Sequence, residues 1–231
     1  MSKLVLAIPS KGRLMEQAAE LFAKAGLELR KSGHERGYQG HIVGIDSAEV
    51  RFVSASEIAQ LLKSGQAHLG VTGEDLIRET MFDAEKRVTF LKPLGFGQAD
   101  VVVAVPACWI DVRRMSDIEA IAAAFRRTHG RRLRVATKYT NLARRFFAAN
   151  GVTSYRMVES LGATEGTVAA GGADLIVDIT STGQTLAANG LKQLEDGTVL
   201  ASQATLLASK IATWTPEARE AENEIMGRLE I

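Results

Sequence analysis

The chain has little of three features that each mark a particular class of protein. Cys108 is the only cysteine in 231 residues, so no disulfide can form within the chain and a cytoplasmic location is expected. The 28 basic and 27 acidic side chains nearly cancel, which argues against bulk attraction to nucleic acid or to a membrane. The apolar run over residues 4–8 stops at Pro9 and is followed by Lys11 and Arg13, so it is neither a signal peptide nor a membrane span. An anionic ligand would therefore need local donors.

Several specific catalytic motifs are also absent from the sequence. The four histidines show no zinc-binding spacing such as H-E-x-x-H, and Cys108 has no partner motif. No G-x-x-x-x-G-K-[ST] loop occurs, which excludes a P-loop NTPase. A basic cluster lies around His129, but no aromatic stripe accompanies it, so a solvated helix end is favoured over a nucleic-acid patch. The cluster comprises Arg126, Arg127, Arg131, Arg132 and Arg134.

The composition is that of an ordinary globular protein, with 46% apolar and 24% charged residues. Short apolar runs alternate with amphipathic segments, which predicts an α/β fold with parallel sheets and with ligands at the carboxyl ends of the strands. Strands are predicted over residues 4–8, 68–71, 88–91, 100–105, 133–138, 175–179 and 199–208. Helices are predicted over residues 14–25, 54–62, 142–147 and 216–231, and a β-hairpin over residues 34–53.

The second half of the chain repeats the plan of the first. Residues 133–151 follow the order strand, lysine, helix and glycine that is seen over residues 5–26, and residues 65–72 and 171–178 share a G-x-A-x-L-x-V frame. This repetition predicts two α/β lobes. The first would cover residues 1–105, with residues 187–231 returning to it, and the second would cover residues 106–186 and carry the phosphate-binding loop described next.

Residues 174–186 read as a buried strand that runs into a small hydroxyl-rich loop. Gly183 allows backbone N–H groups to approach an anion, and a helix beginning near Leu186 would add partial positive charge. Asp178, at the strand end, would accept hydrogen bonds from sugar hydroxyls or meet a Mg²⁺ carried by the ligand. An ordinary Ser/Thr/Gly turn is the alternative. The loop hydroxyls belong to Thr180, Ser181, Thr182 and Thr185.

Other loops could serve the same chemistry. Lys11 and Arg13 flank Gly12 at a predicted helix N-terminus. Cations are unfavourable there because they oppose the helix dipole, but they could bind a polyphosphate. The alternative is that both side chains are simply solvated at the surface. Residues 72–75 offer a hydroxyl and carboxylates, which capping of the next helix explains equally well. Lys138 could hold a phosphate and Tyr139 could stack on a base. The alternative is that the lysine extends its charged end to solvent and that the tyrosine packs in the core.

Five motifs in order resemble the short form of ATP phosphoribosyltransferase over nearly the whole chain. They are AIPSKGRL at residues 7–14, LGVTGEDL at 69–76, LGFG at 94–97, RVATKY at 134–139 and ADLIVDITSTGQTL at 173–186. The last is similar to the family's loop for 5-phosphoribosyl 1-pyrophosphate (PRPP). The resemblance implies a two-lobed fold like type II periplasmic binding proteins, with a ligand cleft between the lobes. It also implies Mg²⁺-dependent joining of ATP N1 to PRPP C1 with release of pyrophosphate, the first step of histidine biosynthesis.

The resemblance also implies residue roles. Lys11, Arg13 and Asp178 would be catalytic. ATP would contact Lys11, Gly12, Arg13, Gly73 and Asp75, and no direct protein motif for Mg²⁺ is expected beyond a substrate-borne ion near Asp178. PRPP would contact Glu165, Asp174, Asp178, Thr180, Ser181, Thr182, Gly183, Gln184, Thr185 and Leu186.

Two departures and several assembly expectations follow from the same resemblance. Thr167 and Val168 stand where relatives often have Ala-Pro. Residues 53–59 lack the family's Arg/Asp-Ile-Pro pattern, and this second departure affects how the purine would be bound.

The chain is expected to lack the long form's regulatory domain. It would instead form a homodimer within a hetero-oligomer containing a regulatory subunit similar to histidyl-tRNA synthetase. Two alternatives are a non-catalytic solute-binding or sensor module of the same fold and a conventional phosphoribosyltransferase, although the latter usually carries two adjacent acids where Ile179 follows Asp178.

Overall fold

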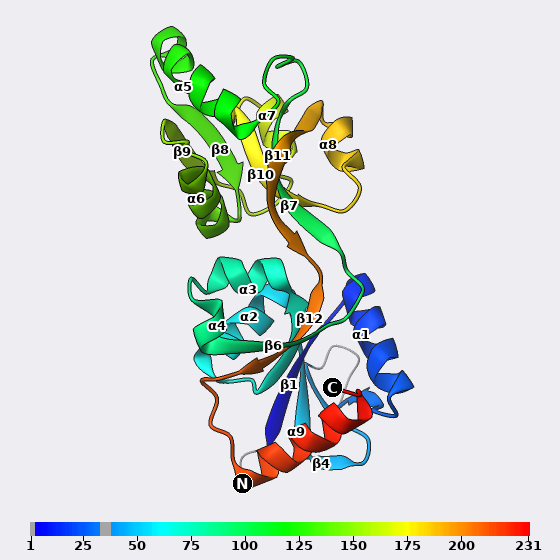
Figure 1. The fold of residues 1–231 in the computed structure, drawn as a ribbon. Coiled ribbons are helices and arrows are strands. Elements are labelled where there is room, and N and C mark those ends of the chain that lie inside the picture. Colours follow the sequence, from blue (N-terminus) through cyan, green and yellow to red (C-terminus); the bar gives the residue numbers. More distant parts are fainter. Residues whose placement is uncertain (1–2, 33–37) are drawn as a thin grey trace. The chain divides into compact units, whose positions relative to one another are not determined.

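A computed structural model describes residues 3–32 and 38–231 (Figure 1). The chain divides into two compact units: unit 1 contains Met1–Gly97 and Gln203–Ile231, and unit 2 contains Gln98–Ser202. These boundaries correct the expected ones at residues 105 and 187. Strand β7 (Ala99–Pro106) pairs with two strands of unit 2, and β11 (Leu191–Ser202) pairs with β7, so both strands belong to unit 2.

The described residues of unit 1 form a seven-stranded sheet in the order β2-β3-β4-β1-β5-β12-β6. Its central strand β1 runs parallel to β4 and β5, while β12 is antiparallel to β5 and β6. The strands are β1 (Leu4–Pro9), β2 (Leu29–Lys31), β3 (Gln39–Ile42), β4 (Ile45–Val53), β5 (Leu69–Gly73), β6 (Val88–Pro93) and β12 (Ala204–Ser209). The helices are α1 (Gly12–Lys24), α2 (Ala55–Ser64), α3 (Glu74–Thr80), α4 (Ala84–Arg87) and α9 (Pro216–Arg228).

Strand β1 is buried on both faces, as its continuous apolar sequence predicts. Leu6 and Ile8 pack into a core that includes Phe22 of α1 and Ile225 of α9. Residues on the other face pack with α2 and α3, including Ala7. This burial on both faces holds the carboxyl end of β1, and the loop that follows it, in a defined place.

The predicted hairpin is present as β3 and β4, which pair antiparallel. Gly44 makes the turn with φ 84°, a left-handed conformation that glycine adopts without a steric cost. Residues 34–37 of the prediction lie outside the described residues.

Unit 2 contains a five-stranded sheet in the order β11-β7-β10-β8-β9. Strands β8, β9 and β10 are mutually parallel, whereas β7 and β11 are antiparallel to their neighbours. The remaining elements of the unit are α5 (Met115–His129), β8 (Leu133–Thr137), α6 (Thr140–Ala149), β9 (Tyr155–Glu159), α7 (Gly166–Ala169), β10 (Leu175–Thr180) and α8 (Gln184–Ala188).

The predicted single strand over residues 199–208 is wrong. The segment is the end of β11 in unit 2 and most of β12 in unit 1, separated at Gln203. The first half of β11 escaped prediction because its polar residues lie on a sheet edge and its pairing with β7 is broken by two register shifts. Among the helices that the structure describes, none is long and apolar enough to cross a membrane.

Candidate functional site

The carboxyl ends of three parallel strands meet at one edge of the unit 2 sheet. Strand β8 lies between β10 and β9, and the Ser160 N–H just after β9 donates to the Thr137 carbonyl at the end of β8 over 3.0 Å. Residues 137–139, 160–165 and 178–183 therefore gather at this edge. Ligands of α/β sheets bind at such an edge because the strand-end loops converge there.

The loop after β10 is organised by its own hydroxyl groups. The Gly183 N–H donates to Thr180 Oγ1 over 2.9 Å, and the Gln184 N–H donates to Thr182 Oγ1 over 3.4 Å. Both threonine oxygens act as acceptors in these bonds, so their hydroxyl hydrogens can donate to an anion. Ser181 differs, because its Oγ donates to the Gln98 carbonyl over 3.1 Å.

Gly183 has φ 72°, and a Cβ added at this position would meet nothing within 4 Å. The position thus requires a left-handed backbone and faces open space, the arrangement expected where an anion approaches a turn of backbone N–H groups. The helix that follows, α8, has only five residues, and its first intrahelical bond is Ala187 N–H to Gly183 O. A helix this short contributes little dipole, so the loop itself is the main anion-binding feature, with the side chains of Gln184 and Thr185 exposed and Leu186 buried beneath them.

Asp178 lies in β10, partly buried, immediately before this loop. Its Oδ1 accepts from the Ile179 N–H over 2.8 Å. Burial raises the pKa of the Asp178 carboxyl; the bond from Ile179 and the charge of Lys138 lower it, and the charge of Glu165 raises it. The net pKa is above the ordinary value, so the negative charge of Asp178 is incompletely compensated within the protein.

A buried pair of hydroxyls supports Asp178 from the β9–α7 connection. Thr164 Oγ1 donates to Ser160 Oγ over 3.1 Å, and the Thr164 hydroxyl is close enough to the Asp178 carboxyl to lower its pKa. Thr164 is 2% and Ser160 8% exposed. The sequence pointed to Glu165 here but missed both hydroxyls, because only the fold brings residues 160–164 next to β10.

Lys138 and Tyr139 also reach this edge. The Lys138 Nζ lies 4.9 Å from the centre of the Tyr139 ring, while the Tyr139 side chain is only 1% exposed. The Tyr139 ring is thus part of the core, as one of the two alternatives from the sequence had it. Lys138 is exposed and supplies the positive charge nearest Asp178.

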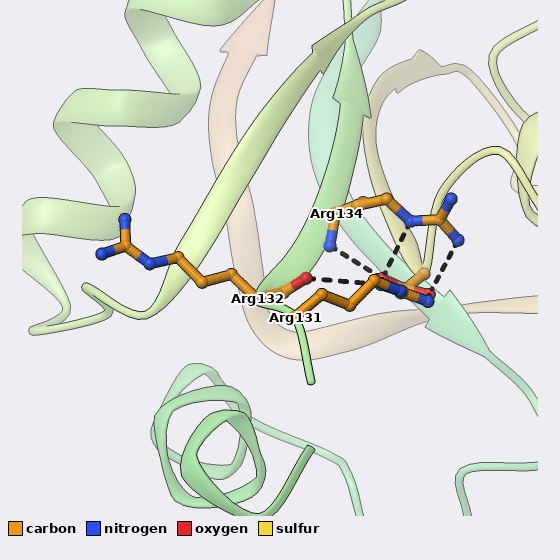
Figure 2. A network of polar contacts seen from close by, with 4 residues as sticks. Arg131, Arg132 and Arg134 are labelled. Carbon is orange, nitrogen blue, oxygen red and sulfur yellow. Dashed lines mark hydrogen bonds and ion pairs between the residues drawn. The ribbon is translucent and has the colours of Figure 1, made fainter. Parts of the chain in front are cut away.

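Asp174 directly precedes β10, at the end of the strand opposite to this group. Figure 2 shows Arg131 and Arg134 as members of one polar network. Arg131 donates both terminal nitrogens to the two oxygens of Asp174 over 2.5 and 2.9 Å, and the Arg134 backbone N–H donates over 2.8 Å. Burial alone would raise the pKa of Asp174, but these bonds outweigh it and lower the pKa to about 2.

The expectation that Asp174 contacts PRPP is therefore corrected. Its side chain is 10% exposed and saturated by Arg131 and Arg134, and it precedes the strand whose far end carries the loop. The physical role of Asp174 is to tie the start of β10 to the start of β8. Two of the five arginines of the basic cluster share the single negative charge of Asp174.

In unit 1, Lys11 and Arg13 lie at the start of α1, as predicted. Lys11 occupies the N-cap position with no side-chain capping bond, and the first turn of α1 contains no acidic residue. Both cations are exposed, and neither has an ion-pair partner among residues 3–32 and 38–231. The N-terminus of a thirteen-residue helix with two cations is suited to bind an anion. Gly12 between them has φ 74° and faces open space.

Gly73 and Asp75 lie at the end of β5, next to β1 in the same sheet. Gly73 is the N-cap residue of α3, and Asp75 lies in its first turn, where it is 5% exposed. A carboxylate in this position stabilises the helix N-terminus. The neighbouring Thr72 donates its hydroxyl to Ala55 O over 2.9 Å, so this hydroxyl is used within the protein.

No group of three His, Cys, Asp or Glu side chains that could hold a metal occurs in the part of the chain that the structure describes. Asp178 and Glu165 are close enough for each charge to act on the other. One or two carboxylates beside substrate phosphates are the usual protein contribution to a bound Mg²⁺. The residues thus fit an ion carried mainly by the substrate.

The fold of the chain has relatives among solved structures. Arginine-bound truncated ArgBP from T. maritima superposes with a TM-score of 0.54 at 12% identity, covering 99% of this chain and 95% of that chain. This likeness confirms the expected two-lobed α/β fold of the type II periplasmic-binding-protein kind. Within this fold, the strand-end loop of unit 2 with its open, left-handed Gly183 is suited to bind an anion.

A family model for HisG, ATP phosphoribosyltransferase, matches residues 54–230. The ATP phosphoribosyltransferase of Afipia carboxidovorans is 60% identical over 225 residues, which make up 97% of this chain and 69% of that protein. The chain belongs to the ATP phosphoribosyltransferase family. It is therefore a transferase of histidine biosynthesis that joins N1 of ATP to C1 of PRPP and releases pyrophosphate, and not a non-catalytic binding module.

A solved relative agrees with this assignment. The ATP phosphoribosyl transferase (HisG:HisZ) complex from Thermotoga maritima contains a chain that superposes with a TM-score of 0.74 at 25% identity. The alignment covers 98% of this chain and 96% of that chain. The family resemblance predicted from the five motifs is thus confirmed.

Proposed function

We propose that the loop after β10 binds the 5-phosphate of PRPP and that Asp178 faces its ribose. The observation that carries this proposal is the open, left-handed Gly183, which follows Thr180 and Thr182 in the loop after a carboxylate whose charge is incompletely compensated. Thr180 and Thr182 donate their hydroxyl hydrogens to phosphate oxygens, as does the backbone of the turn. Glu165 and the residues from Gln184 to Leu186 complete the wall of this site.

The reaction needs orientation and charge stabilisation more than proton transfer. Adenine N1 is unprotonated at neutral pH, so it attacks C1 without a strong general base while the bond to pyrophosphate breaks. Positive charge develops on the ribose ring in the transition state, and the carboxylate of Asp178 stabilises it. Lys138 balances the phosphate charge from the neighbouring strand end.

We propose that Lys11, Gly12 and Arg13 contact the polyphosphate of ATP, with Gly73 and Asp75 nearby on the same edge of the unit 1 sheet. The support is that both cations lack partners among the described residues and that the α1 N-terminus has no side-chain cap. Unpaired cations at that position disfavour the helix, so a ligand anion would offset their cost.

Magnesium is the proposed cofactor. The ion would supply positive charge to the pyrophosphate leaving group. Asp178 and Glu165 would be the protein carboxylates nearest to it. Burial is the main cause of the raised pKa of Asp178 and repulsion from Glu165 adds to it, so a nearby cation would favour the ionised carboxylates.

We further propose that the protein works in the cytoplasm as a homodimer within a hetero-oligomer that contains a regulatory subunit. The support for the subunit is that the T. maritima relative is a HisG:HisZ complex. The support for the compartment is Cys108, which is exposed and free.

One assay tests the proposed cofactor and the proposed regulatory subunit together. The chain, with and without the regulatory subunit, is mixed with ATP, PRPP and Mg²⁺, and pyrophosphate release and the near-ultraviolet absorbance of the product are followed. Activity should disappear when Mg²⁺ is chelated and return on its addition. Activity that persists in excess chelator would contradict the magnesium proposal, and equal activity with and without a bound subunit would remove the reason for a hetero-oligomer.

A further inference from the structure

A second pocket lies in unit 2, between helix α6 and strand β9. It is open and has a volume of about 600 Å³. Four of its lining residues, called its floor here, are largely apolar: Ala148, Val152, Tyr155 and Met157. Thr153 and two arginines, called its rim arginines here, complete the lining: Arg144 and Arg156. It shares no residue with the group around Asp178.

The floor of this pocket is preformed. The Tyr155 ring packs edge-on against the buried Phe147 ring, with centroids 4.8 Å apart at 70°. The neighbouring turn is held by Glu119, whose carboxylate accepts from the Thr153 N–H over 2.9 Å. Binding of a partner to this surface would therefore cost little conformational entropy of the pocket side chains.

The rim arginines carry uncompensated charge. Neither Arg144 nor Arg156 has a carboxylate partner among the described residues, whereas Arg131 and Arg134 share Asp174. Burial raises the pKa of Tyr155, and the positive charge of Arg144 acts against that rise, so Arg144 and the Tyr155 hydroxyl interact electrostatically. The pocket thus combines an apolar floor with two cations that point to an acidic ligand.

Strand β9 also ends the sheet. It pairs with β8 on one side, and no described strand pairs with its other side. Its outer backbone groups are therefore open for pairing with another chain. Arg156 lies on this strand and is exposed.

A second copy of this chain is a poor occupant. In a two-fold contact the same patch meets itself, so Arg144 and Arg156 would approach their own symmetry copies. A nucleic acid is also disfavoured, because two cations around an apolar floor neutralise few phosphates. An acidic protein segment with one apolar anchor satisfies both the charges and the floor.

We infer that the pocket between α6 and β9 docks an acidic segment of the regulatory subunit, with its carboxylates on Arg144 and Arg156 and an apolar side chain against Tyr155 and Met157. This inference rests on the proposed hetero-oligomer. It assigns the docking surface to unit 2, away from the loop after β10.

The test measures the affinity of the whole chain for the purified regulatory subunit by titration calorimetry. The double variant Arg144→Glu/Arg156→Glu should bind about 100-fold more weakly, with the loss reduced at high salt. The matched control is Arg126→Glu/Arg127→Glu, which reverses two exposed arginines of α5 that also lack partners among the described residues. The control should stay within about threefold of wild type. A second variant, Arg144→Gln/Arg156→Gln, removes the two charges without reversing them and is less disruptive to folding. The catalytic activity of each free chain checks that the variant is folded.

Each outcome separates the two proposals. Normal affinity in both Arg144/Arg156 variants, with wild type binding, would overturn the docking surface and leave the hetero-oligomer standing. Absence of binding by wild type would overturn both. A loss of self-association or of nucleic-acid binding in the variants, with subunit affinity unchanged, would assign the pocket to one of those occupants instead.

Discussion

The two ends of strand β10 carry the same residue type in opposite chemical settings. Asp174, at the start, is saturated by Arg131 and Arg134, and its pKa falls to about 2. Asp178, at the other end, has no arginine partner among the described residues of unit 2, and its pKa is raised, mainly by burial. A carboxylate compensated by the protein serves the fold, whereas one left partly uncompensated beside an open loop is available to a ligand.

The geometry of the sheet produces this difference. Strands β8 and β10 are parallel, so their starts share one edge and their ends share the other. The start of β8 brings arginines to Asp174, and the end of β8 brings Lys138 towards Asp178. The following predictions exchange or weaken individual members of these two groups.

The largest expected effect is that of Asp178→Asn on catalysis. Removing the charge that faces the ribose should lower kcat/KM by about 100-fold or more. The thermal midpoint should stay the same or rise, because the raised pKa means that the ionised carboxylate is disfavoured in the folded state. Steady-state kinetics and calorimetry on one preparation measure both. A large fall in the midpoint would show that Asp178 is structural after all.

Asp174→Asn should do the reverse. It leaves two arginines around a neutral group, so the free energy of unfolding of unit 2 should fall by about 2–4 kcal/mol. The kcat/KM value at 25 °C, below the unfolding transition, should stay within about threefold of wild type. Chemical denaturation followed by activity at low temperature separates these effects, and a 100-fold activity loss in the folded variant would return Asp174 to the active site.

The same residue predicts a pH dependence. The pKa of Asp174 is lowered in the folded state from 3.8 to about 2, so its stabilisation is present above pH 4 and is lost as the pH falls towards 2. The shift corresponds to about 2 kcal/mol in wild type. Asp174→Asn lacks this contribution, so its stability curve should converge with that of wild type in acid. If the free energies of unfolding of wild type and Asp174→Asn fell in parallel with decreasing pH, other groups would be responsible for the loss of stability in acid.

A smaller effect is expected from the two left-handed glycines that flank β10. Gly183 has φ 72° and Gly171 has φ 72°, and a Cβ at either meets nothing within 4 Å. Each change to alanine costs similar backbone strain, about 1–2 kcal/mol. Only Gly183→Ala should also weaken PRPP binding, by about tenfold. Equal PRPP affinities in the two variants would argue against a phosphate at this loop.

The smallest effect is that of Thr164→Val, which keeps the shape but removes the hydroxyl beside Asp178. The loss of one hydrogen bond should lower kcat/KM by about fivefold, and Thr164→Ser should restore most of it. The control is Thr167→Val, which removes a hydroxyl that donates to the Thr164 carbonyl over 2.6 Å. A similar loss in both variants would point to a general disturbance of the β9–α7 connection.

Much of this arrangement could be predicted from the sequence. Local patterns were sufficient for the buried strands, for the cations at the start of α1 and for the hydroxyl loop, because each depends on a short run of residues. The family motifs supplied the reaction. The division into two α/β units was also foreseeable from the internal repetition.

What could not be predicted depends on long-range pairing. Asp174 and Asp178 look alike in one short segment, and only the parallel register with β8 shows that Arg131 and Arg134 meet the first. The crossing from β11 to β12 was missed because an edge strand with polar residues and bulges lacks the alternation of a regular strand. Thr164 lies ten residues from β10 in sequence, so its contact with Asp178 leaves no local signal.

The most direct test of the two-ended description is amide hydrogen exchange on the wild-type chain with and without PRPP and Mg²⁺. Exchange should slow at residues 178–186 and 160–165, which lie at the carboxyl edge of the unit 2 sheet. It should remain unchanged at residues 131–134 and 174, which lie at the other edge. Protection at the Arg131–Asp174 end, with none in the loop after β10, would contradict the assignment of the PRPP site.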